Sequence, residues 1–342
     1  MQNNPLVTVI TPTYNHEKYI VECIKSVQAQ TFTDWEMIIV NDGSTDRTAE
    51  VISEYIKDDT RIQLINQTNI GIFRLKETYQ QGINIAKGEY ISIIDGDDVW
   101  EPHKLEWQVS ALEKNEDAIL SWGKAHSSSA NLSVNIALSP DANLFAGKSV
   151  YFSNKPKGSI LNLLLIENCI PAMTATFRKT VLDNIGGFIQ SYNLPLVDIS
   201  TFIELAKHGE FNYIDQPLGK WRTYPHQTTK TFPVEIIKGR YKLCLDQYAG
   251  LSTEIKNKLT ISKKDIENHF REFILIAYAR SGRYKLIRRM FAEARKDYIN
   301  AIFYKGFNKP IWRLRAIIGY IFSLFRMNVE GISKMLGKDS YK

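Results

Sequence analysis

The sequence has few cysteines and lacks both a leader pattern and a long apolar run. Only Cys23, Cys169 and Cys244 are cysteines among its 342 residues. Their wide spacing fits neither a zinc-ligand pattern nor a disulfide framework. A reducing compartment, the cytoplasm, is therefore the expected location. The first residues place no basic segment ahead of an apolar one, so no secretory signal is predicted.

Glycine-rich phosphate-binding loops are also missing after the first expected strand, Val7–Thr11. The chain continues there as Thr11-Pro-Thr-Tyr-Asn15, which argues against a dinucleotide oxidoreductase and against a P-loop nucleotidase. A rigid turn at Pro12 followed by Tyr14 suits a flat ring that lies against the strand end. An ordinary connection between a strand and a helix explains this motif equally well.

Three carboxylates follow another apolar strand. Asp95, Asp97 and Asp98 surround Gly96 directly after the run Tyr90–Ile94. Carboxylates at the carboxyl end of a buried strand point into the crevice where open α/β sheets bind ligands. They repel one another unless a hard cation such as Mg²⁺ or Mn²⁺ lies between them. A solvated acidic turn and a calcium loop are alternatives for the motif taken alone.

A further acidic residue, Asp42, ends the expected strand Glu36–Asn41. Its position at the carboxyl edge would let its carboxylate accept the N3–H of a uracil ring. The following residues also form a good turn, with Gly43 for positive φ and Ser44 or Thr45 as a helix cap. Both interpretations can hold together, because the cap does not need Asp42.

Apolar β-rich runs alternate with helical patterns through the first hundred residues, which predicts a doubly wound, mostly parallel α/β sheet. We expect a catalytic domain over 1–230, with a donor half at about 1–120 and an acceptor half at about 120–230. Residues 125–158 suggest a long surface excursion, and 231–342 suggest a helical, basic region. The expected strands are Val7–Thr11, Glu36–Asn41, Arg61–Asn66, Tyr90–Asp95, Ala118–Trp122, Thr174–Phe177, Phe211–Ile214 and Leu218–Trp221.

Several segments, taken together, resemble family 2 of the glycosyltransferases, which has the GT-A fold. Their order and spacing match the family over the first hundred residues, and weaker likeness continues to Arg222. The basic tail has no counterpart. The matching segments are Val9–Asn15, Ser26–Phe32, Ile39–Asp46, Ala86–Ile91 and Asp95–Asp98, followed by Gly186–Phe188, Val197-Asp198 and Gly219–Arg222.

The resemblance implies roles for these residues. Asp42 would bind the donor's nucleobase, Asp95 the ribose, and Asp97 a divalent metal, Mn²⁺ or Mg²⁺, with Asp98 beside it. Asp198 would be the general base that deprotonates the acceptor hydroxyl, and inversion at the anomeric carbon would follow from a single displacement. The nucleotide-binding residues expected in this way are Thr11, Pro12, Tyr14, Asp42, Asp95 and Gly96.

Three positions depart from the family pattern. The usual Glu-Asp pair is Val197-Asp198 here, which keeps the expected base without its acidic neighbour. A longer segment near Arg74 prevents a confident match to a phosphate contact, so Arg74 and Arg222 remain candidates for that role. The family's histidine two residues past the arginine is replaced by Tyr224, and His226 is left as a candidate metal or phosphate ligand.

Charge is distributed unevenly along the chain. Arg280–Lys342 has a net charge of +11 and the preceding residues −5, within a total of +6. An apolar stripe around Trp312–Phe325 has basic residues on its flanks, which is typical of an interfacial helix on an anionic membrane. Packing of this stripe against the catalytic domain is an equal alternative. A nucleic-acid partner is not expected, because no nucleic-acid-binding module accompanies the charge.

These features together predict an inverting, metal-dependent glycosyltransferase. The expected donor is a nucleotide-sugar, UDP-linked by preference, and the expected acceptor is a hydroxyl of a cell-surface glycan or lipid-linked saccharide at the inner face of the plasma membrane. A non-catalytic nucleotide-sugar-binding subunit is the alternative. An aspartyl phosphohydrolase is disfavoured, since its carboxylates would follow the first strand. The sequence specifies neither the sugar nor the oligomeric state.

Overall fold

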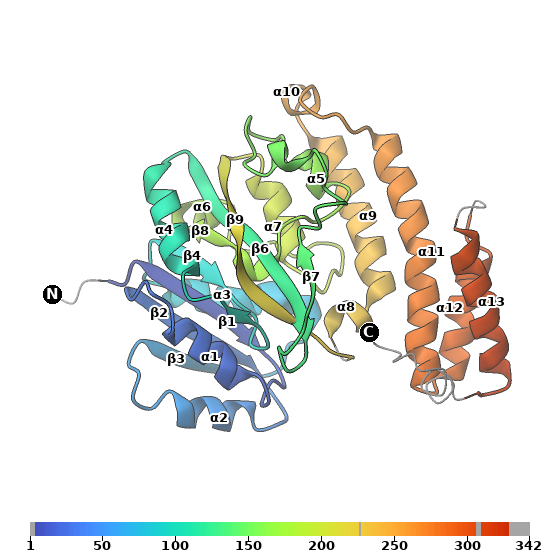
Figure 1. Ribbon diagram of the computed structural model, residues 1–342, viewed down its shortest axis with the longest axis horizontal. Coiled ribbons are helices and arrows are strands. Elements are labelled where there is room, and N and C mark those ends of the chain that lie inside the picture. Colours follow the sequence, from blue (N-terminus) through green and yellow to red (C-terminus); the bar gives the residue numbers. More distant parts are fainter. Residues whose placement is uncertain (1–3, 226, 306–308, 328–342) are drawn as a thin grey trace. The chain divides into compact units, whose positions relative to one another are not determined.

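The computed structural model describes residues 4–225, 227–305 and 309–327 (Figure 1). These residues divide into two compact units. The first comprises the described residues of Met1–Ser191, Leu196–Thr223 and Leu251–Thr260. The second comprises those of Tyr192–Pro195, Tyr224–Gly250 and Ile261–Lys342.

The first unit begins with a parallel sheet, as its alternating pattern predicts. Its strands are β1 (Val7–Thr13), β2 (Trp35–Asp42), β3 (Ile62–Gln67) and β4 (Tyr90–Ile93), in the order β3-β2-β1-β4. Valine and isoleucine fill these strands because both sheet faces are covered. The crossover helices are α1 (Ile20–Gln28), α2 (Thr48–Tyr55) and α3 (Leu75–Ile85).

The sheet continues with mixed pairing beyond β4. The further strands are β5 (Val99–Trp100), β6 (Ala118–Ser129), β7 (Asn135–Ser139), β8 (Thr176–Arg178) and β9 (Glu210–Thr223). β8 runs antiparallel to β4 and β6, whereas β6 and β9 are parallel. The predicted α/β sheet is therefore parallel from β3 to β4 and mixed beyond β4.

Two expectations for the middle of the chain need correction. Phe211–Ile214 and Leu218–Trp221 belong to one strand, β9, whose register against β6 shifts between them. The segment 125–158 is not a loop throughout, because β6 extends to Ser129 and pairs with β7. Sequence periodicity missed this pairing since the side chains of β7 are mostly exposed.

Shorter helices cover the remaining part of the first unit. Its core joins both halves of the sheet, with Trp35, Trp122, Phe177 and Phe202 among the largest fully buried side chains. The helices are α4 (Lys104–Lys114), α5 (Leu161–Leu164), α6 (Lys179–Asn184), α7 (Asp198–Leu205) and α10 (Thr253–Lys256), with 3-10 turns η1 (Ile72–Arg74), η2 (Ser149–Tyr151) and η3 (Ala172–Thr174).

The strand register places the carboxyl ends of β1, β2 and β4 side by side. Thr13 of β1 pairs with Asn41 of β2, and Ile10 of β1 pairs with Ile93 of β4. The residues that follow these strands therefore meet at one edge of the sheet. Such an edge, where the strand order reverses, is where open α/β sheets bind ligands.

The second unit is helical. It contains α8 (Thr228–Thr231), α9 (Pro233–Gly250), α11 (Lys263–Ile287), α12 (Phe291–Ile302) and α13 (Pro310–Leu324). A capping box of Ser262 and Asp265 begins α11, and the ring of Tyr298 packs closely against Gly282 and Gly319. None of the helices in the described ranges is both long and apolar enough to cross a membrane.

Candidate active site

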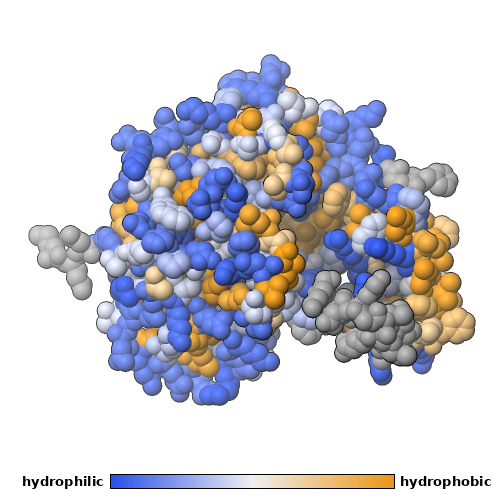
Figure 2. Space-filling view, viewed as in Figure 1, coloured by the Kyte–Doolittle hydropathy of each residue, from blue (hydrophilic) through white to orange (hydrophobic). Residues whose placement is uncertain are grey.

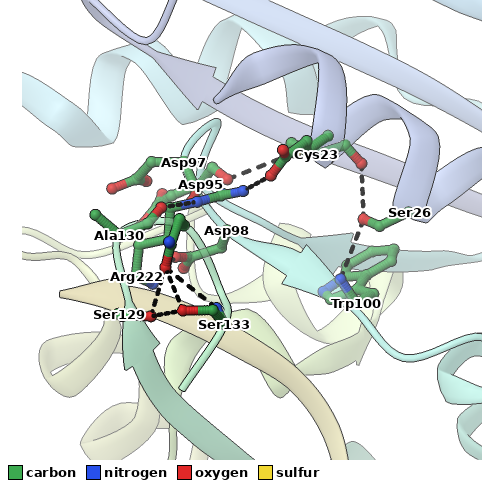
Figure 3. A network of polar contacts seen from close by, with 12 residues as sticks. Cys23, Ser26, Asp95, Asp97, Asp98, Trp100, Ser129, Ala130, Ser133 and Arg222 are labelled. Carbon is green, nitrogen blue, oxygen red and sulfur yellow. Dashed lines mark hydrogen bonds and ion pairs between the residues drawn. The ribbon is translucent and has the colours of Figure 1, made fainter. Parts of the chain in front are cut away.

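The three carboxylates that follow β4 lie together. One oxygen from each of Asp95, Asp97 and Asp98 is within 4.8 Å of the others. Asp97 and Asp98 are 9% and 6% exposed, whereas Asp95 faces the open side of the crevice. Figure 3 shows the three side chains on the turn that follows β4. The sequence therefore predicted this cluster correctly.

The carboxylates repel one another electrostatically. Desolvation, followed by the charge of Asp97, raises the pKa of Asp95 to about 7. Burial and the charges of Asp97 and Asp95 also raise the pKa of Asp98 well above its ordinary value. A cation bound among these oxygens would relieve this repulsion.

Asp198 lies close enough to contribute to the electrostatics of this cluster. Its charge also raises the pKa of Asp95 and is among the causes that raise the pKa of Tyr79. The buried hydroxyl of Tyr79 donates a hydrogen bond of 3.3 Å to Asp95. The structure thus brings Asp198, which is far away in sequence, to the same site as the carboxylates after β4.

The position of Asp198 is set by α7 and by one amide. Asp198 is the first residue of α7 and is partly buried. The Asn168 side chain donates a hydrogen bond of 3.0 Å from Nδ2 to Asp198 Oδ2. The preceding residue, Val197, stands where the family pattern has glutamate. Its side chain is buried and contributes to packing. This hydrogen bond from Asn168 helps to orient the Asp198 carboxylate.

Asp42 already accepts several hydrogen bonds. Its Oδ1 accepts from Gln67 Nε2 at 2.7 Å and from the Ile70 amide at 2.9 Å, and its Oδ2 accepts from the Gly71 amide at 3.1 Å. Two carboxylate oxygens offer about four acceptor positions in total. Oδ2 therefore retains an acceptor position for one further donor, such as a base N–H.

Two glycines permit close approach of the backbones at this edge. Gly43, which follows Asp42, has φ +63°, and a Cβ there would lie 2.5 Å from the Asn69 amide nitrogen. A Cβ on Gly96 would lie 2.5 Å from Thr13 Oγ1. A larger residue at position 43 would force the turn after β2 away from Asn69, and one at position 96 would force the turn after β4 away from β1.

The motif after β1 supplies one exposed ring. Thr11 and Pro12 are buried within β1, whereas the Tyr14 side chain is 43% exposed. Tyr14 is thus the member of the motif with a free surface for a planar ligand. Thr11 and Pro12 contribute backbone and packing.

Arg222 of β9 is buried at the centre of the polar network in Figure 3. Its guanidinium donates to the carbonyl oxygens of Asp97 and Ala130 and to the carboxylate of Glu22. Its backbone amide donates to Asp98 Oδ1 at 3.2 Å. These contacts fix the turn that carries the carboxylates, which differs from the expected contact of Arg222 with a substrate phosphate.

Helix α1 holds the same turn from another side. The Cys23 thiol lies 3.6 Å from the Asp95 carbonyl oxygen as a donor. Ser26 Oγ donates to the Cys23 carbonyl at 2.7 Å and accepts from the Trp100 amide at 3.1 Å. The turn from Asp95 to β5 is therefore held by hydrogen bonds at both ends.

The two remaining candidates receive little support. The Arg74 guanidinium pairs with Glu77 at 2.5 Å on the exposed surface of α3, so a phosphate contact would require this pair to separate. His226, the candidate metal or phosphate ligand, lies outside the described residues.

Sequence reasoning did not identify Tyr79, Asn168 or Glu22. Each acts on a predicted residue through a contact between distant segments, and a lone sequence contains no local signal for such contacts. Tyr79 belongs to the apolar face of α3, where a core role was the natural interpretation. Glu22 lies on α1 among ordinary solvated charges.

Residues 8–186 match the family model described as "Glycosyl transferase family 2". The chain belongs to this family. The match confirms the resemblance carried by the segments after β1, β2 and β4, and it includes all three carboxylates of the cluster. Asp198 and Arg222 lie beyond the matched residues.

Curated relatives match this family 2 chain over its first part. The "Uncharacterized glycosyltransferase EpsJ" of Bacillus subtilis is 41% identical over 119 residues, 35% of this chain and 34% of that protein. "Glycosyltransferase GlyG" of Streptococcus pneumoniae is 36% identical over 116 residues, 34% of this chain and 38% of that protein. The chain thus matches little more than a third of the length of these relatives.

Solved structures share the fold over most of the chain. TarS 1-349 of S. aureus, in complex with UDP, aligns with a TM-score of 0.55 and 17% identity, covering 97% of this chain and 92% of that one. The mannosyltransferase PcManGT of Pyrobaculum calidifontis, in complex with GDP-Man and Mn²⁺, gives 0.53 and 17%, covering 95% and 88%. The predicted GT-A fold with a helical carboxyl-terminal region is confirmed.

Proposed function

We propose that this protein is an inverting, metal-dependent glycosyltransferase that moves a sugar from a nucleotide-sugar to a hydroxyl group. The observation that carries the proposal is the cluster of Asp95, Asp97 and Asp98, in which one carboxylate oxygen of each lies within 4.8 Å of the others; the charge of Asp198 also acts on Asp95. A base for the acceptor and a carboxylate cluster for the donor are then present in one site. Membership of family 2 supports the same chemistry.

The carboxylate cluster suits a divalent metal, Mn²⁺ or Mg²⁺. Its donor atoms are hard oxygens, which these cations prefer, and their mutual repulsion raises the pKa values of Asp95 and Asp98. We assign Asp97 and Asp98 as the ligands. When bound, such a cation supplies positive charge to the diphosphate of the donor as the bond to the sugar breaks.

The remaining steps are assigned to residues of the chain. Asp42 accepts the base N–H at its remaining position, the Tyr14 ring covers the base, and Asp95 binds the ribose. Asp198 takes the proton of the acceptor hydroxyl while that oxygen forms the bond to the anomeric carbon. The bond to the nucleoside diphosphate breaks with its electron pair on the leaving oxygen, and the configuration inverts.

A uracil nucleotide is the preferred donor, because a single acceptor position on Asp42 matches the N3–H of uracil. The structures that share the fold contain UDP, UDP-GlcNAc or GDP-Man, which supports a nucleoside diphosphate. Relatives named for teichuronic acid and colanic acid biosynthesis support a cell-surface glycan or lipid-linked saccharide as acceptor. We place the reaction at the cytoplasmic face of the plasma membrane.

We also propose a division of labour along the chain. Residues 1–120 form the donor half and 120–230 the acceptor half of the catalytic domain, with 231–342 as the helical region. Arg222 is proposed as a positioning residue rather than as a phosphate ligand, because its guanidinium is buried among protein oxygens. It holds the Asp97 carbonyl oxygen through its guanidinium and the Asp98 carboxylate through its backbone amide.

A panel of nucleotide-sugars tests this function. Thermal shifts with UDP-, GDP-, dTDP- and CMP-sugars in the presence of Mn²⁺ should single out UDP-sugars, since a ligand at ~100 times its Kd stabilises by about 2.7 kcal/mol. Metal-dependent hydrolysis of the stabilising donor should follow. Donor binding without any hydrolysis or transfer would instead favour a non-catalytic nucleotide-sugar-binding subunit.

A further inference from the structure

Helix α13 in the second unit presents an apolar face that no described residue covers. Only small residues of this helix are buried, namely Ala316, Gly319 and Ser323. The large apolar residues lie on the opposite side and are 41% to 73% exposed: Ile311, Leu314, Ile317, Ile318, Ile321, Leu324 and Phe325. Figure 2 shows this surface along the right-hand edge of the view.

Within the second unit, the burial of α13 shows which of its two faces is the packing surface. The small face of α13 packs on Tyr298 of α12, so the large apolar side chains are not the packing surface within the second unit. A contiguous apolar surface of this kind marks an interaction site in a water-soluble domain. The burial pattern was invisible in the sequence, because the stripe looked equally suited to a core.

The basic residues of α13 lie on both edges of this face. At about 100° per residue, the seven exposed apolar residues occupy an arc of about 140°. Arg313 falls at one edge of the arc, where its guanidinium donates to the carbonyl oxygens of Ile302 and Tyr304, and Arg315 falls at the other edge. Arg326 follows the end of the helix, with a left-handed φ of 50°. An apolar face with cations at its edge and at its carboxyl-terminal end suits a helix lying in a membrane interface.

The charge around the apolar face of α13 favours an anionic lipid surface over a second copy of the chain as its partner. The described residues of 280–305 and 309–327 contain twelve Lys or Arg against two acidic residues, Glu293 and Asp297. A second copy of the chain would bring two such surfaces together and repel. An anionic lipid surface is complementary both to the charge and to the apolar face.

A hollow at one end of the face adds a place for a phosphate group. It has a volume of about 330 Å³ and is lined by Leu286, Ile287, Arg289, Phe291, Arg326 and Met327. Within the described part of the chain, the guanidinium groups of Arg289 and Arg326 have no hydrogen-bonding or ionic partner. Two unpaired guanidinium groups beside apolar side chains suit a lipid headgroup phosphate next to its acyl chain.

We propose that α13 lies in the interface of an anionic membrane. Its apolar residues enter the boundary between headgroups and acyl chains, while Arg315, Arg326 and Arg289 contact lipid phosphates. This attachment is independent of the proposed transferase activity. It would hold the protein where a lipid-linked acceptor is found, and donor hydrolysis in solution does not require it.

Vesicle flotation with the full chain tests the proposal. Vesicles that contain phosphatidylglycerol should bind the protein at low salt and release it as ionic strength rises, because the Debye length falls to about 8 Å at physiological salt. Vesicles of phosphatidylcholine alone should bind poorly, since the apolar face is short.

The apolar contribution is tested by replacing Leu314, Ile318 and Ile321 together with Asn. These side chains are exposed, so Tm should change little while vesicle binding is lost. A matched control replaces three equally exposed apolar residues of the first unit with Asn and should bind like the wild type. The control positions are Val134, Ile136 and Val150.

The charge contribution is tested by Arg315→Glu combined with Arg326→Glu. Vesicle affinity should fall by more than about tenfold. Arg313 is left unchanged, because its guanidinium donates to the carbonyl oxygens of Ile302 and Tyr304 and so has a structural role. The control, Lys57→Glu with Lys148→Glu, makes the same charge change on exposed positions of the first unit.

Several results would overturn the proposal. Failure of the wild type to bind vesicles at any salt concentration is one, and equal loss of vesicle binding in the test and control variants is another. Equal binding to anionic and neutral vesicles would also contradict the proposal. Sedimentation of the lipid-free protein provides a further check. If the chain self-associates and the α13 apolar variant becomes monomeric without any change in vesicle binding, a second copy is the occupant of the face.

Discussion

At the residue scale, the Asp97 carboxylate belongs, with Asp95 and Asp98, to the cluster proposed to bind the metal. Asp97→Asn keeps the size of the side chain and removes its charge. Activity and metal-dependent donor affinity should each fall by about 10²-fold or more, with an unchanged Tm in the absence of metal. The measurement is calorimetry with a UDP-sugar and Mn²⁺, alongside donor hydrolysis.

The matched control for Asp97 is Asp58→Asn, which removes an exposed carboxylate outside the site and should behave like the wild type. Turnover of Asp97→Asn at the wild-type rate, or full activity of the wild type in excess EDTA, would contradict the metal assignment.

The environment of Lys104 predicts how the stability of the protein against unfolding depends on pH. It is fully buried, and its Nζ donates to Ser92 Oγ at 2.5 Å and to Thr176 Oγ1 at 3.0 Å, with no carboxylate partner in the described residues. Desolvation lowers its pKa well below the ordinary lysine value. Both hydroxyls have other hydrogen-bonding partners, so they do not depend on the amine.

Because the folded protein releases this proton at lower pH than the unfolded chain, stability rises with pH up to about 10.4 on account of Lys104. Lys104→Met should remove that dependence. The variant should equal or exceed the wild type in stability at about pH 7, and this advantage should shrink toward pH 10. Urea unfolding of both proteins across this range is the measurement. An advantage that stays constant between pH 7 and about pH 10 would show that the amine remains charged in the folded state.

At the scale of elements, the turn after β2 depends on a glycine. Gly43 and Gly147 have similar positive φ values, +63° and +69°, but a Cβ meets the Asn69 backbone only at Gly43. Gly147→Ala should cost about 1 kcal/mol from backbone strain alone, and Gly43→Ala more than about 2 kcal/mol. Donor affinity should fall in Gly43→Ala only, because Asn69 also donates to the Asp42 carbonyl oxygen. Equal losses in both variants would contradict the clash.

The strand ends of the donor site were predictable from sequence, whereas their supports were not. Asp42 and Asp95 follow apolar runs of strand length, and parallel strands place such residues at one edge. The hydrogen bond from Asn168 to Asp198 joins residues 30 apart, and the bond from Arg222 to Asp97 joins residues 125 apart. Such contacts depend on how β9 and α7 pack, which no local pattern encodes.

The periodicity of apolar residues also failed to predict strand β7, because its side chains are mostly exposed. The strand therefore has no alternating apolar pattern from which its pairing with β6 could be predicted. In α13 the periodicity was correct, but it could not reveal which face is buried. Tyr298 decides this, because only glycine and other small residues fit beside its ring.

At the scale of the whole molecule, charge and chemistry separate along the chain. Residues 1–279 have a net charge of −5, and Arg280–Lys342 have +11. The proposed donor and acceptor chemistry belongs entirely to the first unit, and the proposed membrane face to the second. Loss of vesicle binding and loss of donor hydrolysis should therefore occur in different variants.

The central claim is that one site contains both a donor cluster and a base. Asp198→Asn tests it most directly, with transfer or donor hydrolysis measured beside donor binding by calorimetry. A general base contributes about 10²–10⁴-fold, so the rate should fall by that factor while the affinity for the UDP-sugar and Mn²⁺ stays at the wild-type value. Loss of donor binding, with a rate reduced only in proportion to occupancy, would contradict the assignment of Asp198 as the base.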